Sequence, residues 1–197
     1  MRRTKEESLV TRERIIQASY EIIREKGYDQ MTRDDIASKV GMTRGAVNWH
    51  FSSKEEIYLA ALTKILEDFQ RQRQAFFCDE KLSPEEKIER LIYMPIEMQQ
   101  EYRFINSIPT YLLERQPFKD IISQMAQNRK QCVVQIERCL AQIEAQSGRT
   151  YENRRDLAYI LYFLHEGFRA DHAETVFENG QSIEREYQNY LRLLLHL

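Results

Sequence analysis

Residues 32–54 constrain the fold more than any other stretch of the chain, because they predict two short helices joined by a tight turn. Thr32 opens the stretch with an acidic residue three positions later, the pattern of a capped helix start. Gly41 stands where a helix ends in a left-handed residue, a conformation that glycine enters without a Cβ penalty. Thr43 can cap a second helix over residues 44–51, so the stretch predicts a helix-turn-helix.

The second predicted helix carries side chains that a purely structural helix of its length rarely exposes. Ala46, Val47 and Phe51 supply its apolar face. The remaining side chains suit base edges, phosphates and sugar faces, and they are Arg44, Asn48, Trp49 and His50. An ordinary helical hairpin is the alternative, because helix–glycine–helix arrangements occur in many all-α proteins.

The positions that define a longer pattern are Thr32, Ile36, Ala37, Gly41, Met42, Thr43, Gly45, Val47, His50, Phe51, Lys54 and Glu55. In this spacing they resemble the DNA-binding signature of the tetracycline-repressor (TetR) family. The run TRGAVNWHF is most similar to the multidrug-efflux repressors of that family, where TRGA(V/I)YWHF is usual. Asn48 departs from the pattern, since the family usually has a Tyr there that touches the DNA backbone.

The resemblance and the composition of the second helix together predict a set of DNA-binding residues: Thr32, Thr43, Arg44, Gly45, Asn48, Trp49, His50 and Lys54. We expect Arg44 to reach a guanine edge and Lys54 to contact a phosphate. The amide of Asn48 presents a donor and an acceptor together, which matches adenine N6 and N7. Contact with phosphate or water alone is the other interpretation of Asn48.

The charge of the chain is distributed unevenly around a net value of −2. Residues 1–54 hold eleven Lys and Arg against eight Asp and Glu, whereas the remainder holds eighteen against twenty-three. A basic head on an acidic body keeps phosphate attraction local. Residues 1–10 are basic as well, and they fit either a solvated terminus or an arm that reaches the DNA.

Composition and periodicity predict an all-α fold, with four Pro and six Gly leaving little material for an all-β chain. The TetR resemblance implies about nine helices. We expect a three-helix DNA-binding domain over residues 1–53 and a larger effector-binding and dimerisation domain over residues 54–197. Interior Pro95 should kink a helix over residues 84–101. The other helices are expected from Thr11 to Gly27, from Ser53 to about Phe77, and over 118–146, 151–178 and 182–197.

The last two predicted helices are more apolar than one protomer is expected to cover. We therefore expect a homodimer through a four-helix bundle of residues 151–197, which the TetR resemblance also implies. The chain has neither a run of eighteen apolar residues nor a basic-then-apolar start, so we expect no membrane partner. Its three Cys are too few for a disulfide framework, and a cytoplasmic location is expected.

Met and aromatic residues concentrate around the Pro breaks of residues 94–125, as they do in adaptable apolar pockets. A plain core is the alternative, but the TetR resemblance implies a small-molecule effector in this body. Residues of a late helix could add polar groups. The predicted effector-binding residues are Met94, Met98, Tyr102, Phe104, Tyr111, Phe118, Met125, Tyr162, His165, Glu166 and Arg169.

The sequence offers little support for catalysis, and we expect no enzyme, cofactor or metal site. His165-Glu166 begins like a zinc-protease helix, but Arg169 stands where a second His is required. A metal site with His172 is conceivable, although histidines in a packed helix are more often structural. We expect a DNA-binding transcriptional repressor that a small apolar or amphipathic ligand releases from a palindromic operator. A helical protein-interaction module and an effector-independent activator are the alternatives.

Overall fold

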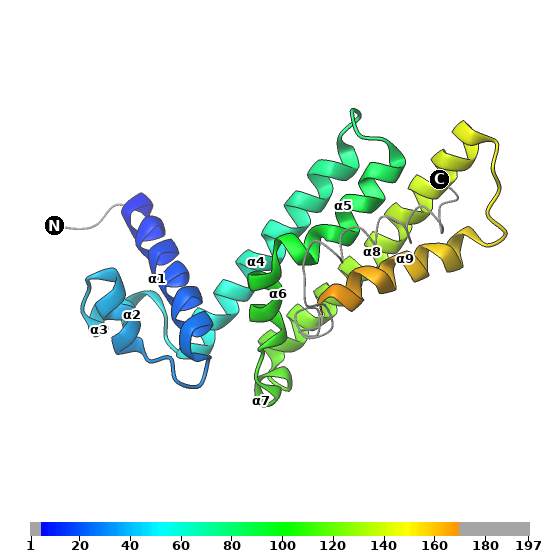
Figure 1. Cartoon of the computed structure of the whole chain (residues 1–197). Helices are drawn as coiled ribbons and strands as arrows, with labels where there is room; N and C mark the ends of the chain where they lie inside the picture. The colour runs from blue at the N-terminus through cyan, green and yellow to red at the C-terminus, as the bar shows by residue number, and fades with distance from the viewer. Residues whose placement is uncertain (1–4, 170–197) are drawn as a thin grey trace. The chain divides into compact units, whose positions relative to one another are not determined.

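The computed structural model describes residues 5–169, and every regular element in this range is an α-helix (Figure 1). The all-α prediction is therefore confirmed for the described part of the chain. Its nine helices are α1 (Lys5–Lys26), α2 (Arg33–Val40), α3 (Arg44–His50), α4 (Lys54–Cys78), α5 (Pro84–Glu97), α6 (Gln99–Asn106), α7 (Thr110–Leu113), α8 (Gln116–Ser147) and α9 (Arg154–Arg169).

The described residues form two compact units, each built from separate stretches of the chain. The first unit contains residues 5–71 and 103–127, and the second contains residues 72–102 and 128–169. Helices α4, α6 and α8 contribute to both units. The boundary expected between residues 53 and 54 stays a prediction. Within the described residues, no helix combines the length and apolar character that crossing a bilayer requires.

The first unit begins with a three-helix core in which α1 packs against α2 and α2 packs against α3. The apolar side chains that join these helices are buried and at most 6% exposed: Ile15, Ile22, Ile36, Val40, Val47 and Phe51. Burial of such side chains contributes roughly 1.5–3 kcal/mol each. Hydrophobic packing therefore holds the two short helices in place on α1.

The predicted helix-turn-helix is confirmed in its local chemistry. The Thr32 hydroxyl accepts from the Asp35 N–H at 3.1 Å, and the Asp35 carboxylate accepts from the Thr32 N–H at 2.8 Å. Gly41 is left-handed (φ 68°, ψ 39°), as the turn requires. The Thr43 hydroxyl then accepts from the Ala46 N–H at 3.2 Å and starts α3.

One predicted helix is two helices in the structure. Instead of a kinked helix over residues 84–101, α5 ends at Glu97 and α6 starts at Gln99. Met98, between them, leaves the helical region (φ −112°, ψ 36°), although its N–H still donates to the Met94 carbonyl at 2.9 Å. Pro95 lies in the last turn of α5, where its missing N–H weakens the helix.

The second unit has one apolar core to which α5, α8 and α9 contribute. Helix α5 packs against α9. The most deeply buried members of the core are Ile88, Leu91, Ile92, Ile136, Leu140, Ile143, Ala158 and Leu161. Residues 170–197, and with them most of the predicted dimer interface, lie outside the described residues.

The capping carboxylate of α2 makes a pH-dependent contribution that can be tested. Hydrogen bonds from Lys26 and Thr32 lower the pKa of Asp35 from 3.8 to about 2. Because the pKa of Asp35 is depressed in the folded state, this stabilisation is fully present well above pH 3.8. It is lost as the pH falls through 3.8 toward 2. We expect the free energy of unfolding of the wild type, measured in urea, to exceed that of Asp35→Asn by an amount that shrinks over this interval. A gap that stays constant with pH contradicts the assignment.

Candidate nucleic-acid interface and effector region

Helix α3 turns its polar and aromatic side chains outward from the first unit. Arg44 and Asn48 are exposed, and Trp49 is 71% exposed, the largest value among the large apolar side chains described. Val47 on the opposite side is fully buried. His50 is half-buried, and its ring meets the Trp49 indole edge-on at a centroid distance of 4.6 Å. The predicted separation of scaffold and exposed residues in this helix is therefore present.

The two predicted threonines already serve as helix caps. The Thr32 hydroxyl donates to the Asp35 carboxylate at 2.6 Å, so both hydrogen-bonding functions of that hydroxyl are engaged. The Thr43 hydroxyl accepts from Ala46 and keeps its own hydrogen for another acceptor. Any contact of these residues with DNA has to be compatible with the caps.

Among the described residues, none blocks a larger side chain at position 45. Gly45 is exposed and helical, and a Cβ added there would meet only the Thr43 hydroxyl, at an ordinary distance of 3.8 Å. Glycine inside a helix destabilises it by roughly 0.5–1 kcal/mol relative to alanine. A molecule that closely approaches the exposed face of α3 would favour glycine at this position.

Lys54 is held against the first unit instead of extending into solvent. Its ammonium donates to the Asp29 carbonyl at 3.0 Å and lies 4.2 Å from the centre of the Tyr28 ring. Burial lowers the pKa of Lys54. An ammonium has three donors, so a phosphate contact beside these partners remains possible and stays a prediction.

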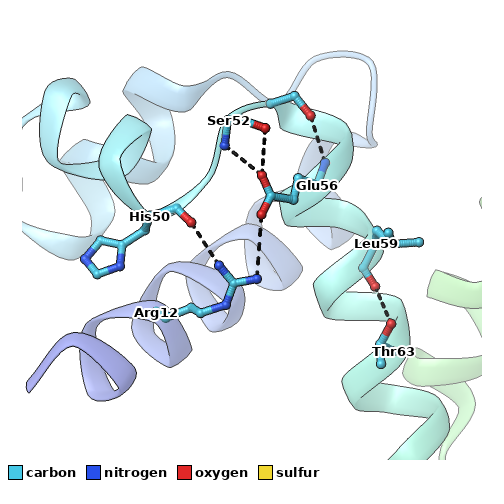
Figure 2. A network of polar contacts seen from close by, with 7 residues as sticks. Arg12, His50, Ser52, Glu56, Leu59 and Thr63 are labelled. Atoms are coloured by element: carbon cyan, nitrogen blue, oxygen red, sulfur yellow. Dashed lines mark hydrogen bonds and ion pairs between the residues drawn. The ribbon is translucent and has the colours of Figure 1, made fainter. Parts of the chain in front are cut away.

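Two arginines of α1 complete the ends of the helix-turn-helix, and the sequence did not reveal them. Arg14 donates to the carbonyl of Val40, the last residue of α2, at 2.8 Å. Arg12 donates to the carbonyl of His50, the last residue of α3, at 2.9 Å (Figure 2). Carbonyls at a helix end have no partner within the helix. Arg12 and Arg14 therefore fix both helices to α1.

Arg12 also reaches the start of α4. Its guanidinium lies 3.9 Å from the centre of the Phe51 ring and 3.8 Å from the Glu56 carboxylate. Figure 2 shows the same carboxylate accepting from the backbone N–H and the hydroxyl of Ser52, at 2.7 and 2.8 Å. The corner between α3 and α4 is thus a bonded network with Arg12 at its centre.

The predicted effector residues fall into two groups, one in each unit. In the first unit, Phe104 and Phe118 are buried beside Tyr58, with ring centroids 5.1 and 6.1 Å from its ring. Burial raises the pKa of Tyr58 to about 12. Tyr111 is exposed and donates to the Asp29 carboxylate at 3.1 Å, whereas Met125 is half-buried.

The second group combines apolar and polar side chains of the second unit. Met94 and Tyr102 are buried and Met98 is half-buried. The Tyr102 hydroxyl lies 3.3 Å from Nε2 of His165, a histidine that is 2% exposed. Another polar contact joins the Tyr162 hydroxyl, as donor, to the Glu166 carboxylate. The side chain of Arg169 lies outside the described residues.

His165 satisfies a carbonyl that Pro95 leaves without its usual donor. In a continuous helix the carbonyl of Leu91 accepts from the N–H four residues later, but that residue is Pro95 and has no N–H. Nδ1 of His165 lies 2.7 Å from this carbonyl, which can only accept, so Nδ1 carries the hydrogen. The histidine therefore has a structural role in α5. Among residues 5–169, no group of three His, Cys, Asp or Glu is placed to hold a metal ion.

Comparison with known proteins places these features in a family. The sequence model of the family described as "Bacterial regulatory proteins, tetR family" matches residues 15–61 of this chain. The probable HTH-type transcriptional regulator ArpR of Pseudomonas putida is 31% identical over 137 residues, 68% of this chain and 64% of that protein. The chain thus spans about two thirds of this relative. The HTH-type transcriptional repressor BepR of Brucella suis is 45% identical over 58 residues, 29% of this chain and 28% of that protein.

Solved structures share the fold at low sequence identity. A putative transcriptional regulator from Saccharomonospora viridis, solved in complex with choline, has a TM-score of 0.72 at 19% identity. The alignment covers 92% of this chain and 95% of that one. At this identity the likeness establishes the arrangement of helices and nothing about the ligand of this chain.

The pairing of Pro95 with His165 predicts a non-additive effect on stability. His165→Ala leaves the buried Leu91 carbonyl without its donor, which costs about 1–3 kcal/mol beyond the lost packing. Pro95→Ala restores an N–H at the right position. We therefore expect His165→Ala to be less destabilising, by about that amount, when Pro95→Ala is also present.

Urea unfolding of the wild type, His165→Ala, Pro95→Ala and the double variant measures this coupling. Tyr102→Phe serves as the control, because it removes the other polar partner of His165 but leaves the Leu91 carbonyl satisfied. Its cost should be the same with and without Pro95→Ala. An equal cost of His165→Ala in both backgrounds contradicts the structural role.

Proposed function

The chain belongs to the TetR family of bacterial regulatory proteins, and on that premise we propose that it is a ligand-responsive transcriptional repressor. The observation that carries the proposal is the outer face of α3, where Arg44, Asn48 and Trp49 are exposed on a helix capped at both ends. A rigid helix with donors and an aromatic ring on its exposed face suits the major groove. The function operates by binding, without catalysis.

The proposed DNA contacts are those expected from the sequence. Arg44 and Asn48 would meet base edges or phosphates, Trp49 a sugar or backbone face, and Lys54 a phosphate. In a dimer the two copies of α3 would enter successive major grooves about 34–36 Å apart, and the operator would be near-palindromic. A repressor of this kind acts in the cytoplasm, where its operator is.

Selection of bound sequences from random duplex DNA tests this function directly. We expect a palindromic consensus, and an affinity for it that falls steeply with salt because phosphate contacts release counterions. Retention of random DNA with no enriched sequence contradicts a specific regulator. A protein that binds no duplex at low salt would instead favour the alternative of a protein-interaction module.

For the effector we propose a small apolar or amphipathic molecule that binds around the second group of residues. Met94, Met98 and Tyr102 offer apolar contact, and His165 and Glu166 offer polar groups. The structure of the Saccharomonospora viridis regulator contains choline, so a related fold accommodates a small organic cation. Loss of operator binding on titration with candidate compounds is the corresponding screen.

Release requires that the effector region influences the DNA-binding helices, and residues 103–127 offer a route. In the first unit this segment bonds to the loop between α1 and α2 through Tyr111 with Asp29, and to the start of α4 through Arg115 with Glu55, at 3.1 and 3.2 Å. Phe104 packs on the same unit beside Tyr58. We propose that the ligand shifts an existing equilibrium between two placements of this segment.

For the dimer we propose an interface within residues 151–197. On α9, Tyr159, Ile160 and Phe163 are 40%, 49% and 66% exposed, an apolar stripe that a partner could cover. Leu161 is fully buried in the core of the second unit, so it is unsuitable for testing the surface.

Phe163→Glu should disrupt this dimer. We expect monomer in sedimentation analysis and a large loss of operator affinity, because a charge would be buried in an apolar interface. Leu9→Glu, on an exposed residue of α1, is the matched control and should remain dimeric. A dimeric Phe163→Glu protein at the same concentration would exclude α9 as part of the interface.

Gly45→Ala should separate stability from DNA binding. Alanine at this helical position should raise the free energy of unfolding by up to about 1 kcal/mol. The added methyl group stands on the face proposed to meet DNA, so operator affinity should fall. Gln142→Ala, at an exposed position of α8 outside the proposed interfaces, is the control and should leave operator affinity unchanged. Unchanged affinity of Gly45→Ala would show that DNA does not closely approach this position.

A further inference from the structure

Asp34 and Arg44 form an exposed ion pair between the two helices of the helix-turn-helix. Nη1 of Arg44 donates to Oδ2 of Asp34 at 3.1 Å. Arg44 is the first residue of α3 and Asp34 the second residue of α2, and the two helices pack against each other. The carboxylate thus stands beside the arginine that we propose reads a base.

The fold gains little from this pair. The side chains of Arg44 and Asp34 are 56% and 64% exposed, respectively. Ion pairs between exposed groups contribute about 0–1 kcal/mol to stability. A carboxylate near DNA also repels phosphates and lowers the affinity for every duplex. An acidic residue beside the recognition helix therefore carries a cost in DNA binding, although its place in the first turn of α2 stabilises that helix.

The geometry leaves Arg44 able to read a base while paired. A guanidinium has five N–H donors, and Asp34 takes one of them. Guanine O6 and N7 require two. A partner that restricts the arginine side chain reduces the conformational entropy lost when it binds the base. The attraction also strengthens when DNA excludes water from the pair.

We propose that Asp34 is a positioning residue that sets the base specificity of Arg44 by holding its guanidinium toward one guanine of the operator. The inference rests on the proposed function, since it needs a protein that reads duplex DNA. It predicts that Asp34 acts through Arg44 and contributes no discrimination of its own.

A double-mutant cycle on DNA binding tests this assignment. Wild type, Asp34→Ala, Arg44→Ala and the double variant are titrated against the selected operator, against operators substituted one base pair at a time, and against random duplex. Glu25→Ala is the matched control, because it removes an equal charge from an ion pair with Lys39 of α2. Asp34→Asn keeps an acceptor oxygen without the charge.

We expect Asp34→Ala to lose discrimination of roughly fivefold or more at the same base pair that Arg44→Ala affects. The double variant should discriminate no worse than Arg44→Ala alone. Binding of random duplex should hold or tighten to the same degree as in Glu25→Ala. Asp34→Asn should retain part of the discrimination, which a folding defect at α2 would not produce.

Three outcomes overturn the proposal. Uniform tightening on all duplexes, equal to that of Glu25→Ala, would leave Asp34 as a source of repulsion only. Discrimination lost at a different base pair would mean that Asp34 itself accepts from a cytosine. A wild-type protein without sequence preference would contradict the proposed function. The positioning role of Asp34, which depends on that function, would then be contradicted as well.

Discussion

The helix-turn-helix depends on satisfying the backbone groups at the ends of very short helices. An α-helix leaves four N–H groups and four carbonyls without internal partners, and α3 has only seven residues. The N-terminal groups are capped by Thr32 and Thr43, and carbonyls at the opposite ends accept from Arg14 and Arg12. Because isolated helices of this length are unstable, the exposed face of α3 depends on these contacts together with the packing of Val47 and Phe51.

The same contacts explain why a count of charges is a poor guide to DNA contacts. Residues 1–54 are basic in composition, yet many of these cations bind within the protein. Arg12 and Arg14 reach helix ends, Lys26 bonds to Asp35, and Lys54 bonds to a backbone carbonyl. These cations still add to the local positive potential, whereas the contacts that we propose for specific recognition come from the exposed residues of α3.

The parts of the fold that were predictable from the sequence are those that local chemistry determines. The cap at Thr32, the left-handed turn at Gly41 and the exposed face of α3 follow from residue type and spacing, and the structure has all three. The break at Met98 could not be predicted from the sequence, and neither could the division of the predicted effector residues between the two units. Both depend on which distant helices pack together. Arg12 was missed for the same reason, since its partners lie 38 and more residues away.

Because the predicted effector residues are divided between the two units, a ligand in the second unit would have to compete with polar contacts that already exist there. A pocket lined only by Met and aromatic side chains could admit an apolar molecule with little rearrangement. In the second unit, however, His165 already bonds to the Leu91 carbonyl and lies beside the Tyr102 hydroxyl, across the break between α5 and α6. A ligand that takes over one of these bonds must leave another buried polar group to find a new partner, at a cost of about 1–3 kcal/mol if it finds none. That cost is comparable to the coupling free energy of typical allosteric proteins. The polar contacts around Pro95 are therefore sufficient, in magnitude, to link effector binding to a change in the backbone that leads toward residues 103–127.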